Sequence, residues 1–207
     1  MELYKDRFAD ASDFTFIMVG NIDEATATPL IEQYLGALPS INRNEKFRDV
    51  NPDFRKGLYE NNFTREMETA KSTVLMVASG NCKYNQKNVI LMNMLGQLLD
   101  ILYTQTVRED AGGTYGVSCN GSISRYPDPQ GVFQIYFDTD PQRREQMVKL
   151  INEGINDFIA KGPKSEDLDK VKKYMIKTFQ QNQKENGYWM GILSNILWEG
   201  LDMRKDY

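Results

Sequence analysis

No histidine occurs among the 207 residues of this sequence, and its absence excludes several kinds of hydrolytic site. A catalytic zinc site commonly pairs two histidines one helical turn apart, and a Ser-His-Asp or Cys-His centre needs an imidazole as its general base. The only cysteines, Cys82 and Cys119, are too few for a disulfide framework or a zinc knuckle. We therefore expect that this chain alone contains no catalytic residue, binds no metal and is inactive as an enzyme.

Long apolar runs and clusters of basic residues are also absent. The longest apolar stretches, such as 74–78, are far shorter than the roughly 20 residues that span a bilayer. The net charge is -4, and no basic run marks the surface of a nucleic-acid-binding protein. The first residues have neither the basic start nor the apolar core of a secretory signal. The sequence predicts no membrane span and no nucleic-acid partner.

The apolar residues that are present have the spacing of an α+β fold. At 41% hydrophobic and 26% charged residues, the composition is that of a globular protein. Apolar runs and alternation predict strands at 14–19, 72–79, 114–123 and 132–138, and helical spacing predicts helices at 23–36, from 86 onward, and at 147–159, 165–183 and 188–201. The turn-rich segment 125–131 favours a hairpin. This order predicts a mostly antiparallel sheet with helices packed on one face.

One local group of residues has the chemistry of a peptide-binding site. Arg108 and Tyr115 stand on either side of Gly112-Gly113, which separates a predicted helix from a predicted strand. An arginine offers a fork of donors to peptide carbonyls or a carboxylate, and a tyrosine hydroxyl can donate to a developing oxyanion. Neither side chain supplies a base. We expect the pair to lie close together, partly exposed on one concave surface, and to bind a peptide without cleaving it.

A simpler interpretation of the same two residues remains open. Alternation along the predicted strand places Tyr115 on the same face as Val117 and Cys119, which is typical of a tyrosine packed on a sheet. Arg108 could then be an ordinary surface arginine paired with Glu109 or with a carbonyl oxygen.

The segment 102–117, with the sequence LYTQTVREDAGGTYGV, resembles the arginine-tyrosine motif of the insulinase/pitrilysin-type zinc peptidases. Further resemblance lies in VGNID at 19–23, YLGALP at 34–39, GPKS at 162–165 and NGYW at 186–189, so it covers nearly the whole chain. In that family one half carries an inverted zinc motif, His-x-x-Glu-His, and a homologous half carries the arginine and the tyrosine. This chain lacks the first motif and keeps the second.

The resemblance implies a function and a division of the chain. Arg108 and Tyr115 would bind the peptide substrate at the zinc site of a catalytic partner half, which alone would hold the zinc. Residues 1–40 would be the closing strand and helix of a preceding homologous domain, 41–71 a polar linker, and 72–207 an incomplete, non-catalytic peptidase-like domain. The resemblance is to bacterial enzymes, and it implies the cell envelope or periplasm as the compartment.

An incomplete second domain would leave a sheet edge with unpaired backbone groups. We therefore expect the strand 14–19 to add to the sheet built by residues 72–138. The alternative is that this strand pairs between two copies in a homo-oligomer.

Two other functions remain open. The chain could be a non-catalytic assembly or chaperone-like subunit of the same fold, in which the pair is inherited but idle. It could also be an unrelated α+β binding module with an accidental motif. Retention of Arg108 and Tyr115 favours the substrate-binding function, and the family's sheet and long helices would exclude the unrelated module.

Overall fold

The computed structural model describes residues 1–43, 46, 48, 50, 54–202 and 204. The chain divides into two compact units, one formed by Met1–Asn51 with Gln180–Met203 and the other by Pro52–Phe179 with Arg204–Tyr207. Part of the predicted linker 41–71 lies outside the described residues, and the predicted division of the chain at residues 40 and 72 stays a prediction. Among the described helices, none combines the length and apolar character needed to cross a bilayer.

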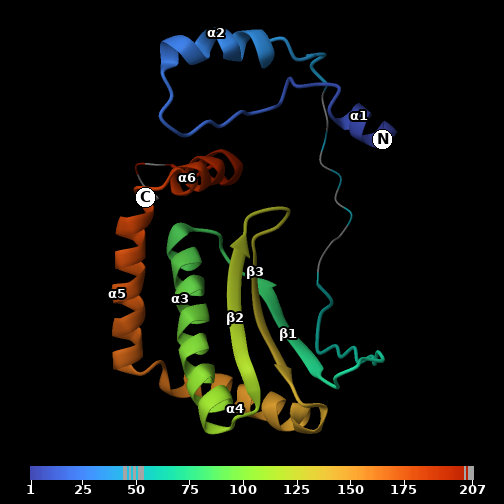
Figure 1. Cartoon of the computed structure of the whole chain (residues 1–207), viewed down its shortest axis with the longest axis vertical. Helices are drawn as coiled ribbons and strands as arrows, with labels where there is room; N and C mark the ends of the chain where they lie inside the picture. The colour runs from blue at the N-terminus through green and yellow to red at the C-terminus, as the bar shows by residue number, and fades with distance from the viewer. Residues whose placement is uncertain (44–45, 47, 49, 51–53, 203, 205–207) are drawn as a thin grey trace. The chain divides into compact units, whose positions relative to one another are not determined.

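A three-stranded antiparallel sheet with the order β1-β3-β2 forms the centre of the larger unit (Figure 1). The strands are β1 Ser72–Asn81, β2 Thr114–Ser124 and β3 Gln130–Thr139. Strand β3 pairs with β1 on one side and with β2 on the other. The hairpin predicted from the turn-rich connection is confirmed as β2 and β3, and so is the mostly antiparallel sheet.

Two long helices, α3 Gln86–Tyr103 and α4 Arg144–Lys161, contribute to a core on one face of this sheet. The Asn85 side chain begins α3 by accepting the backbone N–H of Asn88, and Gly162 ends α4. The core residues come from both helices, the segment after α3, and strands β2 and β3: Leu99, Tyr103, Val107, Val117, Cys119, Ile135, Phe137, Met147 and Ile151. The buried Tyr103 hydroxyl donates to the Ile151 carbonyl at 2.9 Å, so this polar group is paired within the core. The predicted α+β class with helices on one face is confirmed.

Short helical segments flank the two long helices. The π-helix η1 Thr104–Asp110 continues α3, and the 3-10 helix η2 Pro141–Arg143 precedes α4. Helix α5 Ser165–Asn182 follows after Gly162, close to the predicted start. These segments matter for the site, because η1 and η2 lie at the two connections that meet beside the beginning of β2.

The smaller unit contains α1 Glu2–Arg7, α2 Glu24–Tyr34 and α6 Asn186–Glu199. Asp23 is the N-cap of α2, and its side chain accepts the backbone N–H of Thr26. The carboxylate of Asp10 is buried and accepts backbone N–H groups from Ser12, Ile41 and Arg43. It thereby joins two stretches of chain that are 31 residues or more apart.

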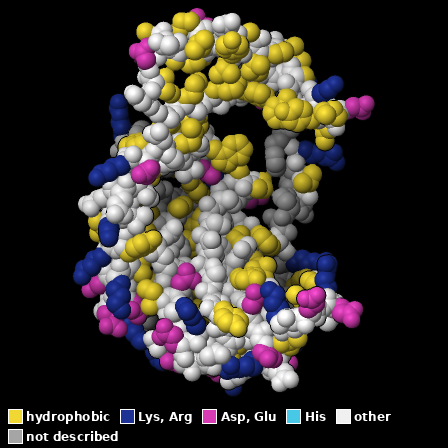
Figure 2. Space-filling view, viewed as in Figure 1, with side chains coloured by type: hydrophobic (Ala, Val, Ile, Leu, Met, Phe, Trp, Pro, Cys, Tyr) yellow, Lys and Arg dark blue, Asp and Glu magenta, His cyan; other side chains and the backbone are white. Residues whose placement is uncertain are grey.

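The predicted strand 14–19 is wrong for this chain, because these residues form no strand and make no ladder with β1, β2 or β3. A strand requires a neighbour that exchanges backbone hydrogen bonds with it, and apolar alternation alone supplies none. Phe14, Phe16 and Met18 are instead exposed. Figure 2 shows hydrophobic side chains gathered over the N-terminal part of the chain. Pairing of this segment between two copies stays a prediction.

Candidate functional site

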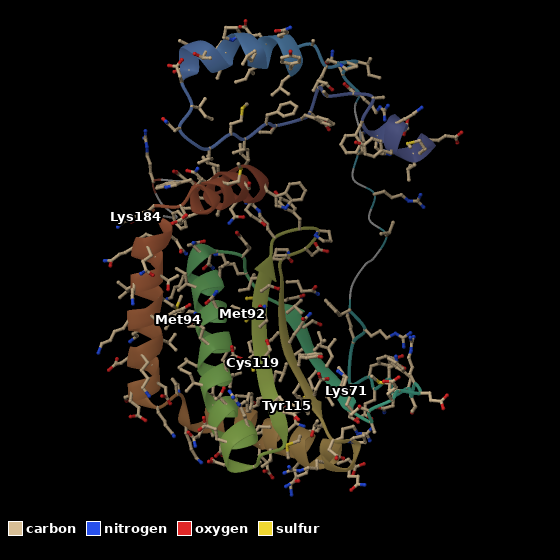
Figure 3. All side chains as sticks on the ribbon, in the orientation of Figure 1. Lys71, Met92, Met94, Tyr115, Cys119 and Lys184 are labelled. Carbon is tan, nitrogen blue, oxygen red and sulfur yellow. The ribbon has the colours of Figure 1, made fainter. Side chains whose placement is uncertain are left out.

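Arg108 and Tyr115 lie where the sequence predicts them, at the end of a helical segment and at the start of a strand. Arg108 is in the last turn of η1, and Tyr115 is the second residue of β2. Both side chains are exposed, Tyr115 to 97%. Figure 3 labels Tyr115 at the end of the sheet where Lys71 leads into β1. Their predicted location on one concave surface stays a prediction.

The helical turn that carries Arg108 is a π-helix, which is wider than an α-helix. The Ala111 N–H donates to the Thr106 carbonyl, five residues earlier, at 3.3 Å. Val107 is fully buried in the core, while the neighbouring Arg108 is exposed. Single π-helical turns are rare, and they occur frequently at functional sites.

Two glycines join η1 to β2, and each has a physical reason to be glycine. Gly112 has a φ of 57°, in the left-handed region that other residues adopt at a cost. A Cβ atom on Gly113 would lie 1.9 Å from the sulphur of Met147, so no larger residue fits there without movement of the core. The Gly113 N–H also donates to the Val107 carbonyl at 3.1 Å. The chain therefore reverses within a very short space between Arg108 and Tyr115.

A β-bulge at the beginning of β2 determines the exposure of Tyr115. Thr114 pairs with Thr139 and Val117 with Phe137, so that two residues of β2 lie opposite the single residue 138. A bulge of this kind re-aims side chains and breaks the strict alternation of faces. The prediction that Tyr115 shares the face of Val117 is therefore wrong, since Val117 is buried and Tyr115 is not.

Neither contact expected from the simpler interpretation is present among the described residues. Tyr115 is not packed on the sheet, and within the described part of the chain Arg108 takes part in no ion pair with Glu109 and in no hydrogen bond to a carbonyl. Two large polar side chains thus project from a braced turn without an intramolecular partner among the described residues.

Sequence reasoning missed Arg143, which holds this turn from the connection between β3 and α4. Its guanidinium donates to two consecutive carbonyls, to Gly112 at 2.7 Å and to Ala111 at 2.6 Å. The hydroxyl of Thr139 donates to the next carbonyl, that of Gly113. Nothing in the sequence marks Arg143, because an arginine beside Arg144 at a helix start is typical of a solvated surface.

A polar cluster lies on the face of the sheet away from the helices. Asp138 accepts hydrogen bonds from the hydroxyl of Thr73, from Lys71 at 3.2 Å and from the hydroxyl of Tyr136 at 3.2 Å. The Thr73 hydroxyl is the main reason that the pKa of this carboxyl is lowered, and Lys71 adds to it. The cluster is close to the bulge, because residues 115 and 116 lie opposite Asp138.

The described residues contain no group of three or more His, Cys, Asp or Glu side chains that could hold a metal ion. Cys119 is buried, and its backbone N–H donates to the carboxylate of Asp100 at 2.7 Å. Burial raises the pKa of the Cys119 thiol, and the nearby Asp100 raises it further. The donor set of the described residues therefore does not fit a catalytic zinc ion.

A family model and several curated proteins match this chain, and all of them concern zinc proteases or the peptidase M16 family. The family described as "Peptidase M16 inactive domain" matches residues 2–175. A "Zinc protease PQQL-like" of Arabidopsis thaliana is 27% identical over 204 residues, which covers 91% of this chain and 21% of that protein. A "Probable zinc protease PqqL" of Haemophilus influenzae is 23% identical over 193 residues, which covers 93% of this chain and 20% of that protein. The chain spans about a fifth of the length of these curated relatives.

Solved structures share the fold. The periplasmic protease PqqL from Escherichia coli superposes with a TM-score of 0.66 at 19% identity, covering 87% of this chain and 20% of that one. A peptidase M16 inactive domain from Pseudomonas fluorescens superposes with a TM-score of 0.55 at 20% identity, covering 65% of this chain and 32% of that one. At these identities the likeness concerns the fold.

Proposed function

This chain belongs to the peptidase M16 inactive-domain family, the insulinase-type family that its sequence resembles, and from that premise we propose that it binds the peptide substrate for a catalytic half elsewhere in the protease. The relatives that it matches are named zinc proteases. The proposal assigns substrate binding to Arg108 and Tyr115 and assigns metal, base and attacking water to the partner half.

The observation that carries the proposal is the exposure of Tyr115. A tyrosine buries a large ring when it stabilises a fold, yet this ring is 97% exposed at the edge of an ordered sheet. The bulge, the two glycines and the turn of η1 all brace the backbone on which this side chain stands. A hydrogen-bonded turn with an exposed tyrosine after it and an exposed arginine before it supports a role in contacting another molecule.

The chemistry of the two side chains differs. The Tyr115 hydroxyl donates a hydrogen bond to the oxygen of the scissile carbonyl, which gains negative charge as the carbonyl carbon becomes tetrahedral. The Arg108 guanidinium offers paired N–H groups to a peptide carbonyl or a substrate carboxylate. Neither group accepts the proton of an attacking water, so this chain orients and polarises the peptide while the partner half supplies the base.

The partner half would carry the His-x-x-Glu-His motif and the zinc ion. No step assigned to this chain requires it to hold a metal, in agreement with the chemistry of its side chains. The Escherichia coli structure is described as a periplasmic protease, and we extend the same compartment to this protein as part of the proposal.

Residues 1–40 have a separate place in the proposal, as the closing strand and helix of a preceding homologous domain. Phe14, Phe16 and Met18 alternate along an extended segment and are 37%, 47% and 45% exposed. Among the described residues, this segment forms no backbone hydrogen-bond ladder with a strand. An apolar segment with unpaired backbone groups fits the edge of another sheet, where both its side chains and its hydrogen bonds would be satisfied.

The test is peptide hydrolysis by the intact protein that contains this chain and its catalytic half. We expect Arg108→Ala to lower kcat/KM roughly 10- to 100-fold, because the substrate loses a charge-assisted hydrogen bond. Arg125→Ala, in the loop between β2 and β3, is the matched control and should leave kcat/KM unchanged. Hydrolysis that is unaffected by Arg108→Ala would favour an assembly or chaperone-like subunit in which the pair is idle.

A further inference from the structure

The turn between η1 and β2 is held by side chains from a distant part of the sequence. Its carbonyl groups at Ala111, Gly112 and Gly113 all accept hydrogen bonds from the end of β3 and from the connection that follows it. Thr139 supplies one of these bonds and Arg143 supplies two. No carbonyl of the turn therefore depends on solvent for its partner.

Arg143 is the central donor of this arrangement. Its two terminal nitrogens bind consecutive carbonyls at 2.7 and 2.6 Å, a geometry that uses the planar fork of a guanidinium. Within the described residues Arg143 takes part in no ion pair. A positive charge beside carbonyls at the end of a helical segment is also favourable, because those carbonyls carry partial negative charge.

The position of Arg143 is itself constrained. Asp140 begins η2 by accepting the backbone N–H of Gln142, and its carbonyl accepts the N–H of Arg143. Four residues later Met147 is fully buried against Gly113. The guanidinium is therefore anchored on both sides, by a capped turn before it and by a core side chain after it.

From this geometry we propose that Arg143 is the positioning residue of the Arg108–Tyr115 pair. Among the described residues, its side chain donates hydrogen bonds to backbone carbonyls and to neither side chain of the pair. It holds the carbonyls of Ala111 and Gly112, which separate Arg108 from Tyr115 along the chain, and so sets the direction in which both side chains leave the backbone. This inference rests on the proposed function, since it names the residue that maintains the geometry of the same site.

Removal of Arg143 should therefore lower catalysis although Arg108 and Tyr115 are both still present. A displacement of about 1 Å in a group that contacts the reacting atoms can cost about 100-fold in rate. We expect Arg143→Ala to lower kcat/KM of the intact protein about 10- to 100-fold. Arg143→Lys should not restore full activity, because one ammonium group cannot reproduce a planar fork on two carbonyls.

A double-mutant cycle separates positioning from simple structural support. In the Tyr115→Phe background the hydroxyl that Arg143 orients is already missing, so the loss caused by Arg143→Ala should shrink. Arg144→Ala is the matched control: this neighbouring arginine forms an exposed pair with Glu145 at 3.6 Å, and kcat/KM should be unchanged. Should Arg143→Ala fail to fold, Arg143→Lys is carried through the same cycle.

The outcomes are distinct. A loss on Arg143→Ala that shrinks in the Tyr115→Phe background supports the proposal. An unchanged kcat/KM, or a loss of the same size in both backgrounds, overturns it, and the second result makes Arg143 a structural residue only. If Arg108→Ala and Tyr115→Phe themselves leave hydrolysis unchanged, the proposed function fails and the positioning role falls with it.

Discussion

Gly113 lies against the side chain of Met147 so closely that a Cβ atom on the glycine would be 1.9 Å from the methionine sulphur. Met147 is fully buried, so its thioether has little room to move. Through this contact, the turn between Arg108 and Tyr115 packs closely against helix α4. The turn at Gly113 and the hydrophobic core are thereby packed together.

The first prediction follows from that contact. Gly113→Ala should lower the free energy of unfolding by about 1–3 kcal/mol, the usual cost of forcing an extra carbon into a packed core. Gly116→Ala is the matched control, because nothing lies within 4 Å of a Cβ atom at that position. Urea unfolding of the purified chain measures both, and equal midpoints for the two variants would contradict the packing argument.

Tyr115→Phe should act on catalysis and not on stability. The ring is 97% exposed and its hydroxyl has no partner among the described residues, so the urea midpoint should be unchanged. In the intact protein we expect kcat to fall by up to about 100- to 1000-fold, the range for one oxyanion donor. Tyr174→Phe, an exposed tyrosine on α5, controls for loss of a phenol as such. Unchanged turnover would leave Tyr115 without a catalytic role.

Asp10 should give the smaller unit a stability that depends on pH. Burial acts to raise its pKa, but the N–H groups of Ile41, Arg43 and Ser12 outweigh it and lower the pKa from 3.8 to about 2. Because the folded pKa is the lower one, this stabilisation is complete above the unfolded value of 3.8 and is lost as pH falls through about 2. At neutral pH the ionised Asp10 carboxylate therefore contributes its full stabilisation to the fold.

The comparison of the wild type with Asp10→Asn measures that effect. At pH 6 the variant should unfold at a lower urea concentration, because an amide accepts hydrogen bonds more weakly than a carboxylate. The difference between the two proteins should narrow towards pH 2. A difference that stays constant over this range would show that the charge of Asp10 plays no part.

The two cysteines should differ in reactivity. Cys119 is buried and its thiol pKa is raised, first by burial and then by Asp100, whereas Cys82 is only half-buried. Since the thiolate is the reactive form, iodoacetamide at pH 8 should modify Cys119 at least about 10-fold more slowly than Cys82. Mass spectrometry of the native and the urea-unfolded chain reads this out. Equal labelling of both thiols in the native chain would contradict the burial of Cys119.

Several elements could be predicted from the sequence because their signals are local. Asp23 and Asn85 accept hydrogen bonds at the start of α2 and α3, and Gly162 ends α4, as their residue types predict. Apolar spacing of three to four residues placed the helices, and the turn-rich connection placed the hairpin. Each of these signals depends on residues within one or two turns of one another.

The candidate site was only partly predictable. The motif identified Arg108 and Tyr115 and placed them at a helix end and a strand start, which the structure confirms. Alternation then put Tyr115 on the buried face, which is wrong because one extra residue in β2 interrupts the pairing with β3. A bulge is a property of two strands together, so one strand read alone does not reveal it.

Spacing by itself indicated which residues form helices and hairpin strands, and the resemblance of one motif to a known family pointed to the pair that carries the proposed function. Tertiary structure alone decided that residues 14–19 form no strand within the described part of the chain, that Tyr115 is exposed, and that Arg143 binds carbonyls 31 and 32 residues away. The physical reason is the same in each case. Almost every residue has the same backbone donor and acceptor. Which donors and acceptors pair therefore depends on how distant segments pack, and this pairing cannot be predicted from the local sequence.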